Sequence, residues 1–188
     1  TRTTLNRLHI YEREVDFYTR LGSRIPVKVP RCYFSKYNSS TGQSTLLLEF
    51  LEGACLDELS GPTQDQAKLA LRAAASVHRF GRDQSVAEES WVHRLDGPEF
   101  LDGMVQGAKE AAPLAAERLQ GLAPDWLLDA APHASTIIAD QLHALAKLPN
   151  TLIHFDFRVG NMLFQPAEQS TQVALIDWQA LLRGPGVC

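Results

Sequence analysis

The 188-residue sequence contains only three cysteines, no long hydrophobic run and no excess of basic residues. Cys32, Cys55 and Cys188 form no Cys-x-x-Cys pair, which argues against a disulfide framework or a zinc knuckle. The longest apolar runs are far shorter than the ~20 residues that cross a bilayer, and no hydrophobic leader segment opens the chain. We therefore expect a protein of the reducing cytoplasm that has no membrane partner.

The balance of charge argues against a nucleic-acid partner. Lys and Arg number 18 against 22 Asp and Glu, which gives a net charge of -4 at pH 7, whereas non-specific binding to phosphates needs a basic surface. Hydrophobic residues make up 45% of the chain and charged residues 21%, as in ordinary globular domains. These values exclude the disordered and fibrous classes and leave the oligomeric state open.

Residues 1–53 predict one helix followed by a β-hairpin. Apolar side chains at three- and four-residue steps predict a helix over residues 4–21. Two apolar runs on either side of a turn-forming cluster predict antiparallel strands over 29–37 and 44–53. Glu14 falls on the largely apolar stripe of the helix, where a part-buried carboxylate needs a cation. A purely structural ion pair with a neighbouring arginine is the alternative.

Residues 54–188 are predicted to be mostly helical. A Thr63-x-x-Gln66 capping box predicts a helix over 63–80, in which His78 is expected to be a core histidine. Prolines divide residues 82–132, where we expect several short helices. The remaining expected elements are a helix over 135–148, short strands over 151–153, 162–164 and 173–176, and a turn at Gly184-Pro185-Gly186.

The most informative segment is residues 152–164, in which His154-x-Asp156 is followed by Asn161. This is the spacing of the kinase catalytic loop H-R-D-x-x-x-x-N. In that loop the Asp accepts the proton of the attacking hydroxyl, and the Asn holds Mg²⁺ on the phosphates. Arg158, two residues after the Asp, is expected to neutralise charge on the transferred phosphoryl group. We therefore expect Asp156 and Arg158 to be catalytic and Asn161 to bind a metal ion.

A second acid stands where a kinase has its metal-binding aspartate. Asp177 ends an apolar segment sixteen residues after Asn161. An aspartate at the end of a strand can bridge Mg²⁺ to phosphates, because Mg²⁺ prefers one or two carboxylates together with phosphate oxygens. Each motif alone is weak, but the two in this order, after a hairpin and helices, form a more specific pattern.

These residues, in this order, resemble the aminoglycoside phosphotransferase and choline kinase-like superfamily of small-molecule kinases. The resemblance extends over nearly the whole chain. It implies a two-lobed, protein-kinase-like α+β fold, with a truncated small β lobe over residues 1–53 and a mostly helical large lobe over residues 54–188. It also implies ATP and Mg²⁺ as cofactors and a hydroxyl group of a small molecule as the acceptor.

The resemblance further assigns residues to nucleotide binding. Glu14 matches the helix glutamate that pairs with a phosphate-binding lysine in this superfamily. Glu49, Phe50 and Leu51 match the hinge between the lobes, where backbone groups near Glu49 and Leu51 meet the nucleobase. Asn161 and Asp177 match the metal ligands.

The sequence departs from the family pattern in several places. No lysine and no Gly-rich loop precede Glu14, and Lys28 follows the helix, where we expect it to be an exposed lysine at a strand edge. Phe155 stands where the family usually has Gly, which predicts a displaced loop or a narrowed pocket. The chain also stops where the family continues after Gly186. We therefore expect an incomplete kinase, inactive by itself, and the alternative is a nucleotide-binding pseudokinase or scaffold.

Other readings of the motifs have less support. A two-His, one-carboxylate iron site needs a second histidine, usually downstream of the pair, and none follows His154. Hydrolase and P-loop signatures are absent from the sequence. Asp156 and Asn161 could still be ordinary turn residues. The insert between hinge and catalytic loop carries acids that form either an acidic wall for a cationic acceptor or a solvated face, namely Glu88, Glu89, Asp96, Glu99 and Asp102.

Overall fold

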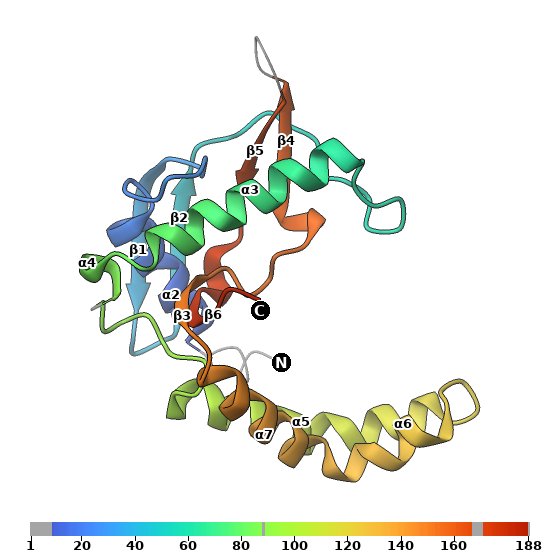
Figure 1. Cartoon of the computed structure of the whole chain (residues 1–188). Helices are drawn as coiled ribbons and strands as arrows, with labels where there is room; N and C mark the ends of the chain where they lie inside the picture. The colour runs from blue at the N-terminus through green and yellow to red at the C-terminus, as the bar shows by residue number, and fades with distance from the viewer. Residues whose placement is uncertain (1–8, 88, 167–170, 188) are drawn as a thin grey trace.

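The computed structural model describes residues 9–87, 89–166 and 171–187 (Figure 1). Its helices are α2 (Ile10–Asp16), α3 (Gln64–Phe80), α4 (Gln84–Ala87), α5 (Pro98–Leu119), α6 (Asp125–Ala130) and α7 (Ala134–Ala146), with a π-helical turn η1 (Phe17–Leu21) and 3-10 turns η2 (Ala131–His133), η3 (Val159–Asn161) and η4 (Trp178–Ala180). Its strands are β1 (Cys32–Asn38), β2 (Gln43–Leu48), β3 (Asn150–Ile153), β4 (Met162–Pro166), β5 (Thr171–Leu175) and β6 (Leu182–Pro185).

The described strands form three antiparallel pairs, β1–β2, β3–β6 and β4–β5. Helix α3 runs across the molecule near β4 and β5, while α5 and α7 lie side by side and project with α6 as an arm (Figure 1). This combination of helices with small separate sheets confirms the predicted α+β class. Among the described residues, no helix is both long and apolar enough to cross a membrane.

The N-terminal helix and the hairpin form largely as expected. The helix begins at Ile10 and ends at Leu21 with a π-helical last turn, and residues 4–8 of the expected helix lie outside the described residues. The hairpin forms between β1 and β2, but β2 ends at Leu48 rather than at residue 53. The Glu49 N–H still donates to the Arg31 carbonyl at 2.7 Å, and among the described residues the backbone groups of Phe50 and Leu51 have no further strand partner.

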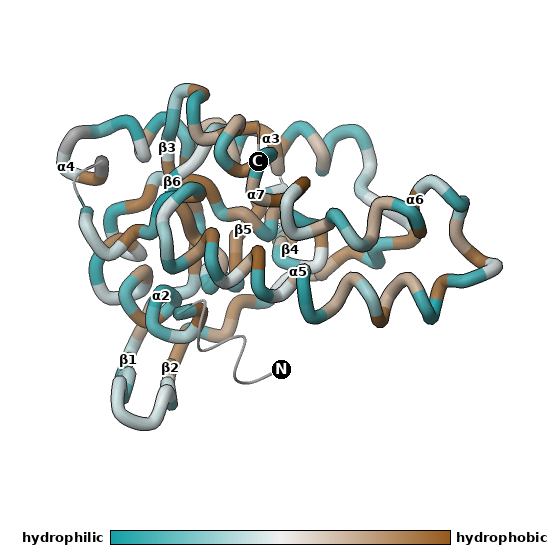
Figure 2. Tube along the Cα trace, turned by 90° about the horizontal axis from the view of Figure 1, so that it is seen from below, coloured by the Kyte–Doolittle hydropathy of each residue, from teal (hydrophilic) through white to brown (hydrophobic). Residues whose placement is uncertain are grey.

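The β3–β6 pair separates two hydrophobic clusters. Alternate residues of a strand point to opposite faces, so Leu152 packs into a cluster with Phe17, Val77 and Trp178, whereas Ile153 packs into a second cluster with Phe100. Figure 2 shows hydrophobic residues gathered around these strands and alternating with polar ones along the α5 arm. The loop that follows β3 is therefore anchored in both clusters at once.

Two expectations for the C-terminal part were wrong. Residues 82–132 were expected to form several short helices, but α5 is a single 22-residue helix with Pro113 inside it. Pro113 is exposed, so water can solvate the carbonyl that loses its hydrogen bond, and packing against α7 holds the helix together. The expected turn at residues 184–186 is also replaced, because Gly184 and Pro185 belong to β6 and pair with Thr151 and Asn150.

The other helices and strands follow the prediction closely. Thr63 and Gln66 form the expected capping box at the start of α3, with both reciprocal bonds present. Helix α7 and strands β3, β4 and β5 lie within a few residues of the predicted ranges. Cys32 and Cys55 are free thiols, as expected, and Cys188 lies outside the described residues.

Gly81 allows the closest contact between a helix and a strand. A Cβ at this position would lie 2.2 Å from the backbone nitrogen of Leu152 and 2.4 Å from its Cβ. We expect Gly81→Ala to lower the free energy of unfolding by about 3 kcal/mol, because the backbone of β3 would have to move. Urea denaturation followed by circular dichroism measures this.

Gly107 provides the control for this prediction. It lies inside α5, and a Cβ there would meet no atom within 4 Å. Gly107→Ala is expected to stabilise the protein by about 1 kcal/mol through helix propensity alone. Equal urea midpoints for the two variants would contradict the close contact at Gly81.

Candidate active site

Asn161 closes the predicted catalytic loop onto Asp156. Its Nδ2 donates to Oδ2 of Asp156 at 2.8 Å and to the Asp156 backbone carbonyl at 3.0 Å. Both bonds use the amide nitrogen, so Oδ1 of Asn161 remains available to a cation. An ordinary turn could contain the same two hydrogen bonds. The surroundings of Asp156 have to distinguish a catalytic loop from such a turn.

Asp177 lies beside this loop, as the sequence predicted. The Ile176 N–H donates to the Asn161 carbonyl at 3.1 Å, and His154 Nε2 bonds the Ile176 carbonyl at 3.0 Å. Asp177 has φ 63° and ψ 66°, a left-handed conformation that non-glycine residues rarely adopt. Burial, followed by the Asp156 carboxylate, raises the pKa of Asp177. The two acids are therefore close enough to repel each other.

Glu14 joins these two acids from α2. Burial and then the Asp177 carboxylate raise the pKa of Glu14 to about 7. The predicted ion pair with a neighbouring arginine is not found within residues 9–87, 89–166 and 171–187: Arg20 pairs with Asp16, and Arg13 donates to the Leu181 carbonyl. Asp177 thus interacts electrostatically with both Asp156 and Glu14, and no described cation pairs with Glu14.

Arg158 lies at the surface of the catalytic loop. Its Nη1 bonds Oε1 of Glu58, and its Nε lies 3.4 Å from the Asp156 carboxylate. Glu58 first, and then Asp156, raise the pKa of the guanidinium. The sequence placed Arg158 beside Asp156 but had no signal for Glu58, which lies 100 residues away along the chain.

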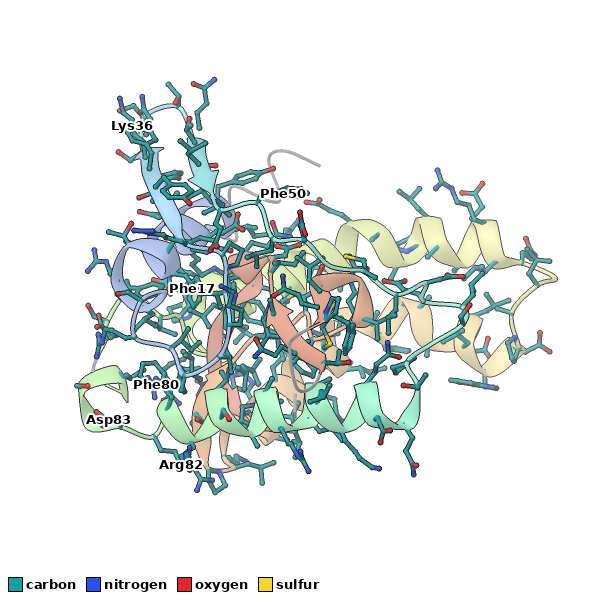
Figure 3. All side chains as sticks on the ribbon, turned by 90° about the horizontal axis from the view of Figure 1, so that it is seen from above. Phe17, Lys36, Phe50, Phe80, Arg82 and Asp83 are labelled. Atoms are coloured by element: carbon teal, nitrogen blue, oxygen red, sulfur yellow. The ribbon has the colours of Figure 1, made fainter. Side chains whose placement is uncertain are left out.

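The hinge residues follow directly after β2. The Glu49 carboxylate accepts a hydrogen bond from the Arg31 N–H at 3.0 Å and lies 3.9 Å from Lys28 Nζ. The backbone groups of Phe50 and Leu51 make no hydrogen bond to other described residues, so they are open to a ligand. Phe50 is 87% exposed and points outward, whereas Phe17 lies in the interior (Figure 3).

Lys28 is an exposed lysine at a strand edge, as predicted. Its backbone carbonyl accepts the Leu175 N–H at 2.9 Å at the edge of β5, and its side chain is 44% exposed. Its ammonium group lies 3.9 Å from the Glu49 carboxylate, and no described ion pair joins it to Glu14. Lys28 therefore does not replace the lysine that the family pairs with Glu14.

Phe155 keeps the backbone conformation that glycine would adopt. Its φ is 64°, in the left-handed region. Its ring packs edge-to-face on Phe100 of α5 with the centroids 5.4 Å apart. The backbone at Phe155 is therefore strained, by about 1–2 kcal/mol, and packing of the ring against Phe100 offsets part of this cost.

Two of the acids of the insert, Glu89 and Asp96, already have hydrogen-bond or ion-pair partners. Glu89 bonds Arg24 at 3.1 Å and Trp91 Nε1 at 2.8 Å, and Asp96 bonds Arg94 at 2.9 Å. Glu88 lies outside the described residues. Because these carboxylates already have partners, the described insert gives little support to a preference for a cationic acceptor.

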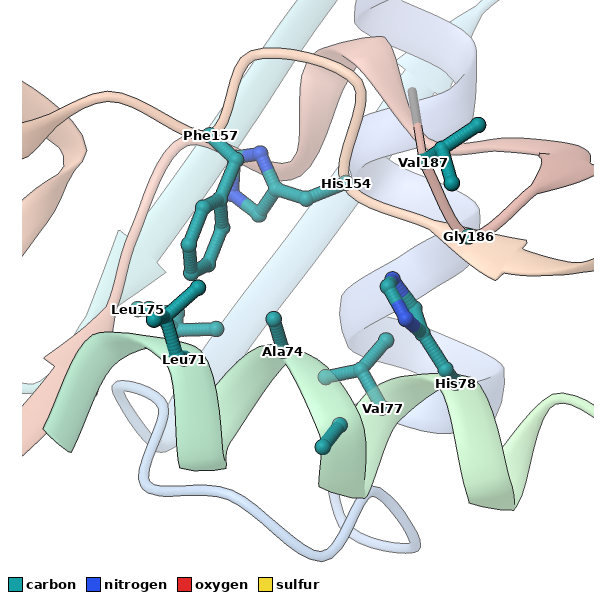
Figure 4. A pocket seen from close by; sticks show the side chains of 10 residues that line it. Leu71, Ala74, Val77, His78, His154, Phe157, Leu175, Gly186 and Val187 are labelled. Carbon is teal, nitrogen blue, oxygen red and sulfur yellow. The ribbon is translucent and has the colours of Figure 1, made fainter. Parts of the chain in front are cut away.

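A cavity of about 420 Å³ lies under the catalytic loop, on the side of α3 (Figure 4). His78 and Leu71 of α3 line it together with His154 and Phe157. His78 is only half-buried, so it lines this cavity instead of packing into the core as predicted. None of the acids Asp156, Asp177 and Glu14 lines this cavity, and we assign the chemistry to the carboxylates instead.

Comparisons with known proteins identify a family and a similar fold. A sequence model described as "Phosphotransferase enzyme family" matches residues 7–188. The fold is similar to the GDP complex of a mutant aminoglycoside 2'-phosphotransferase-IIIa, with a TM-score of 0.59, 16% identity, and coverage of 95% of this chain and 58% of that chain. This similarity confirms the predicted kinase-like fold, and at such low identity it shows the fold alone.

A curated relative is the "Probable acyl-CoA dehydrogenase IBR3" of Arabidopsis thaliana. It is 23% identical over 204 residues, which cover 98% of this chain and 22% of the relative. The chain therefore spans about a fifth of this relative and little more than half of the matched structure.

Because the backbone of Phe155 is left-handed, we predict that glycine at this position is more stable than alanine, the reverse of the order in a helix. Both Phe155→Ala and Phe155→Gly remove the ring from Phe100, but only alanine retains the left-handed strain. We expect the glycine variant to be the more stable by about 1 kcal/mol in chemical denaturation. At Leu114, exposed on α5, the same pair should show the ordinary order, with alanine more stable by about 1 kcal/mol. The same order at both positions would contradict strain at Phe155.

The raised pKa of Glu14 predicts a pH-dependent stability. Between the ordinary value of 4.5 and the folded value of about 7, the folded state binds a proton that the unfolded state has lost, so stability falls as the pH rises through this window. We expect Glu14→Gln to stabilise the protein by about 2 kcal/mol at pH 8 and by almost nothing at pH 4.5. Urea unfolding across this range measures the effect. Glu117→Gln, on the exposed end of α5, should show no such trend.

Proposed function

The chain belongs to the phosphotransferase enzyme family, and from this premise we propose that it transfers the γ-phosphoryl group of ATP, with Mg²⁺, to a hydroxyl group of a small molecule. The observation that carries the proposal is the hydrogen bonding of Asn161 to Asp156 and to the segment of Asp177, whose pKa is raised by burial and then by Asp156. Turn residues alone give no reason for a strained, partly buried second aspartate at this place.

The donor set fits Mg²⁺ bound together with phosphates. The carboxylate of Asp177 and the free Oδ1 of Asn161 are hard oxygen donors, and the uncompensated charge of the neighbouring acids favours a cation. Among the described residues, no three His, Cys, Asp or Glu side chains form a metal-binding group by themselves. An ion such as Mg²⁺ keeps waters and phosphate oxygens among its ligands and would neutralise charge on the phosphates when bound.

The chain's own residues would act on the acceptor and on the transferred group. Asp156, oriented by Asn161, accepts the proton of the acceptor hydroxyl. At the same time the hydroxyl oxygen of the acceptor bonds to the γ-phosphorus, and the bond from that phosphorus to the ADP leaving group breaks. Arg158 neutralises charge on the phosphoryl group. The open backbone groups of Phe50 and Leu51 bind the nucleobase, and Glu14 positions a cation beside the phosphates.

A nucleotide-binding pseudokinase or scaffold remains the second candidate. One observation favours it: in the part of the chain that the structure describes, no lysine or arginine pairs with the partly buried carboxyl of Glu14. A bound nucleotide without transfer in any acceptor assay would establish this alternative. Calorimetric titration with ATP and GTP separates binding from turnover.

Asp156→Asn tests the proposed base. In the protein encoded by the uninterrupted reading frame that contains residues 1–188, we expect kcat to fall by about 10²–10⁴-fold, while the affinity for ATP changes by less than about twofold. Release of ADP from ATP, or of GDP from GTP, is measured with a panel of hydroxyl acceptors, which includes aminoglycosides and, because of the curated relative, hydroxyacyl-CoA thioesters. Asp65→Asn, at a 90% exposed carboxylate on α3, is the control. Undiminished turnover in Asp156→Asn would overturn the assignment of the base.

A further inference from the structure

Glu58 connects the segment after the hinge to the catalytic loop. Its Oε1 accepts a bond from Nη1 of Arg158, although the two residues lie 100 positions apart in the sequence. The same guanidinium reaches Asp156 only at 3.4 Å through Nε. Arg158 is therefore shared between an acid of the loop and an acid from another part of the chain, and the closer contact is to Glu58.

The backbone around Gly160 leaves room for this pair. A Cβ on Gly160 would lie 2.7 Å from Nη1 of Arg158 and 3.0 Å from Oε1 of Glu58. Cys55, three residues before Glu58, has its Sγ 3.7 Å from the Gly160 carbonyl. The segment that contains Cys55 and Glu58 thus lies directly against the turn that contains Arg158 and Gly160.

The pair is too exposed to contribute much stability. The side chains of Arg158 and Glu58 are 52% and 56% exposed, and ion pairs this exposed contribute little to stability because water screens them. The bond to Glu58 instead bears on the direction in which the guanidinium of Arg158 points relative to Asp156. Without Glu58, Asp156 would be the only acid among the described contacts of Arg158, and the arginine would close onto the carboxylate that has to accept a proton.

We propose that Glu58 is a positioning residue for phosphoryl transfer: it holds the guanidinium of Arg158 beside Asp156 but not on it. Asp156 then stays able to accept the proton of the acceptor hydroxyl, and Arg158 stays available to the phosphoryl group. This inference rests on the proposed function for its catalytic consequence. The placement of Arg158 by Glu58 does not depend on that function.

The first measurement follows Arg158 itself by NMR. The ¹⁵Nε–¹Hε signal is assigned by its loss in Arg158→Lys, and rotation about the Nε–Cζ bond is followed through the Nη signals. We expect Glu58→Gln to shift the Nε signal and to free this rotation, because the charge-assisted bond is lost. Glu52→Gln is the matched control, since Glu52 is an exposed acid of the same segment whose side chain touches no described partner. An unchanged Arg158 signal in Glu58→Gln overturns the proposal.

The second measurement determines kcat and KM for ATP separately in variants of Glu58. We expect Glu58→Gln to lower kcat by about 10- to 100-fold with KM for ATP within about twofold, and to have no further effect in an Arg158→Lys background. Glu58→Asp should recover part of the loss. A full additional loss in the Arg158→Lys background, or unchanged kcat, overturns the proposal. Lack of turnover in the unmodified protein overturns the proposed function instead, and the NMR measurement still decides whether Glu58 positions Arg158.

Discussion

The indole of Trp178 is the contact on which the geometry of the site depends. It is fully buried, stacks on Phe17 with centroids 4.1 Å apart and planes 7° apart, and lies 4.6 Å from the His154 ring. These rings come from η1, η4 and the loop after β3, so one aromatic column joins the helix of Glu14 to both aspartate segments. Asp177 precedes Trp178, and burial of the indole supports the left-handed backbone that Asp177 needs.

The acids that lie around these packed rings lower the stability of the fold and make the site suitable for a bound cation. The carboxyls of Glu14 and Asp177 both have raised pKa values, because burial removes water from each, and then because Asp177 acts on Glu14 and Asp156 acts on Asp177. A protein selected for stability alone would place arginines there or remove the acids. Retaining them is characteristic of sites in which a bound ligand supplies the missing positive charge.

Some of the site could be read from local sequence and some could not. The order of His154, Asp156, Asn161 and Asp177 was enough to predict the loop and its second acid, because these residues lie within 24 positions of one another in the sequence. Glu58 could not be found, since its contact with Arg158 spans 100 residues and depends on how the segment after the hinge folds back. The same holds for the left-handed backbone of Phe155. The sequence shows a bulky residue where the family usually has Gly, but only the structure shows that its ring packs on Phe100.

The sequence by itself determined the family pattern, the capping box of α3, the hairpin and the predicted chemistry, because these depend on residue type and short spacing. Tertiary structure decided the rest. Packing against α7 keeps α5 continuous through Pro113, and pairing with β3 turns an apparent Gly-Pro-Gly turn into β6. The tertiary structure also decided that Lys28 pairs with Glu49, and that Glu14 interacts electrostatically with Asp177. Such outcomes depend on which distant segments meet, and the free energy of those contacts exceeds the local preferences that a sequence pattern records.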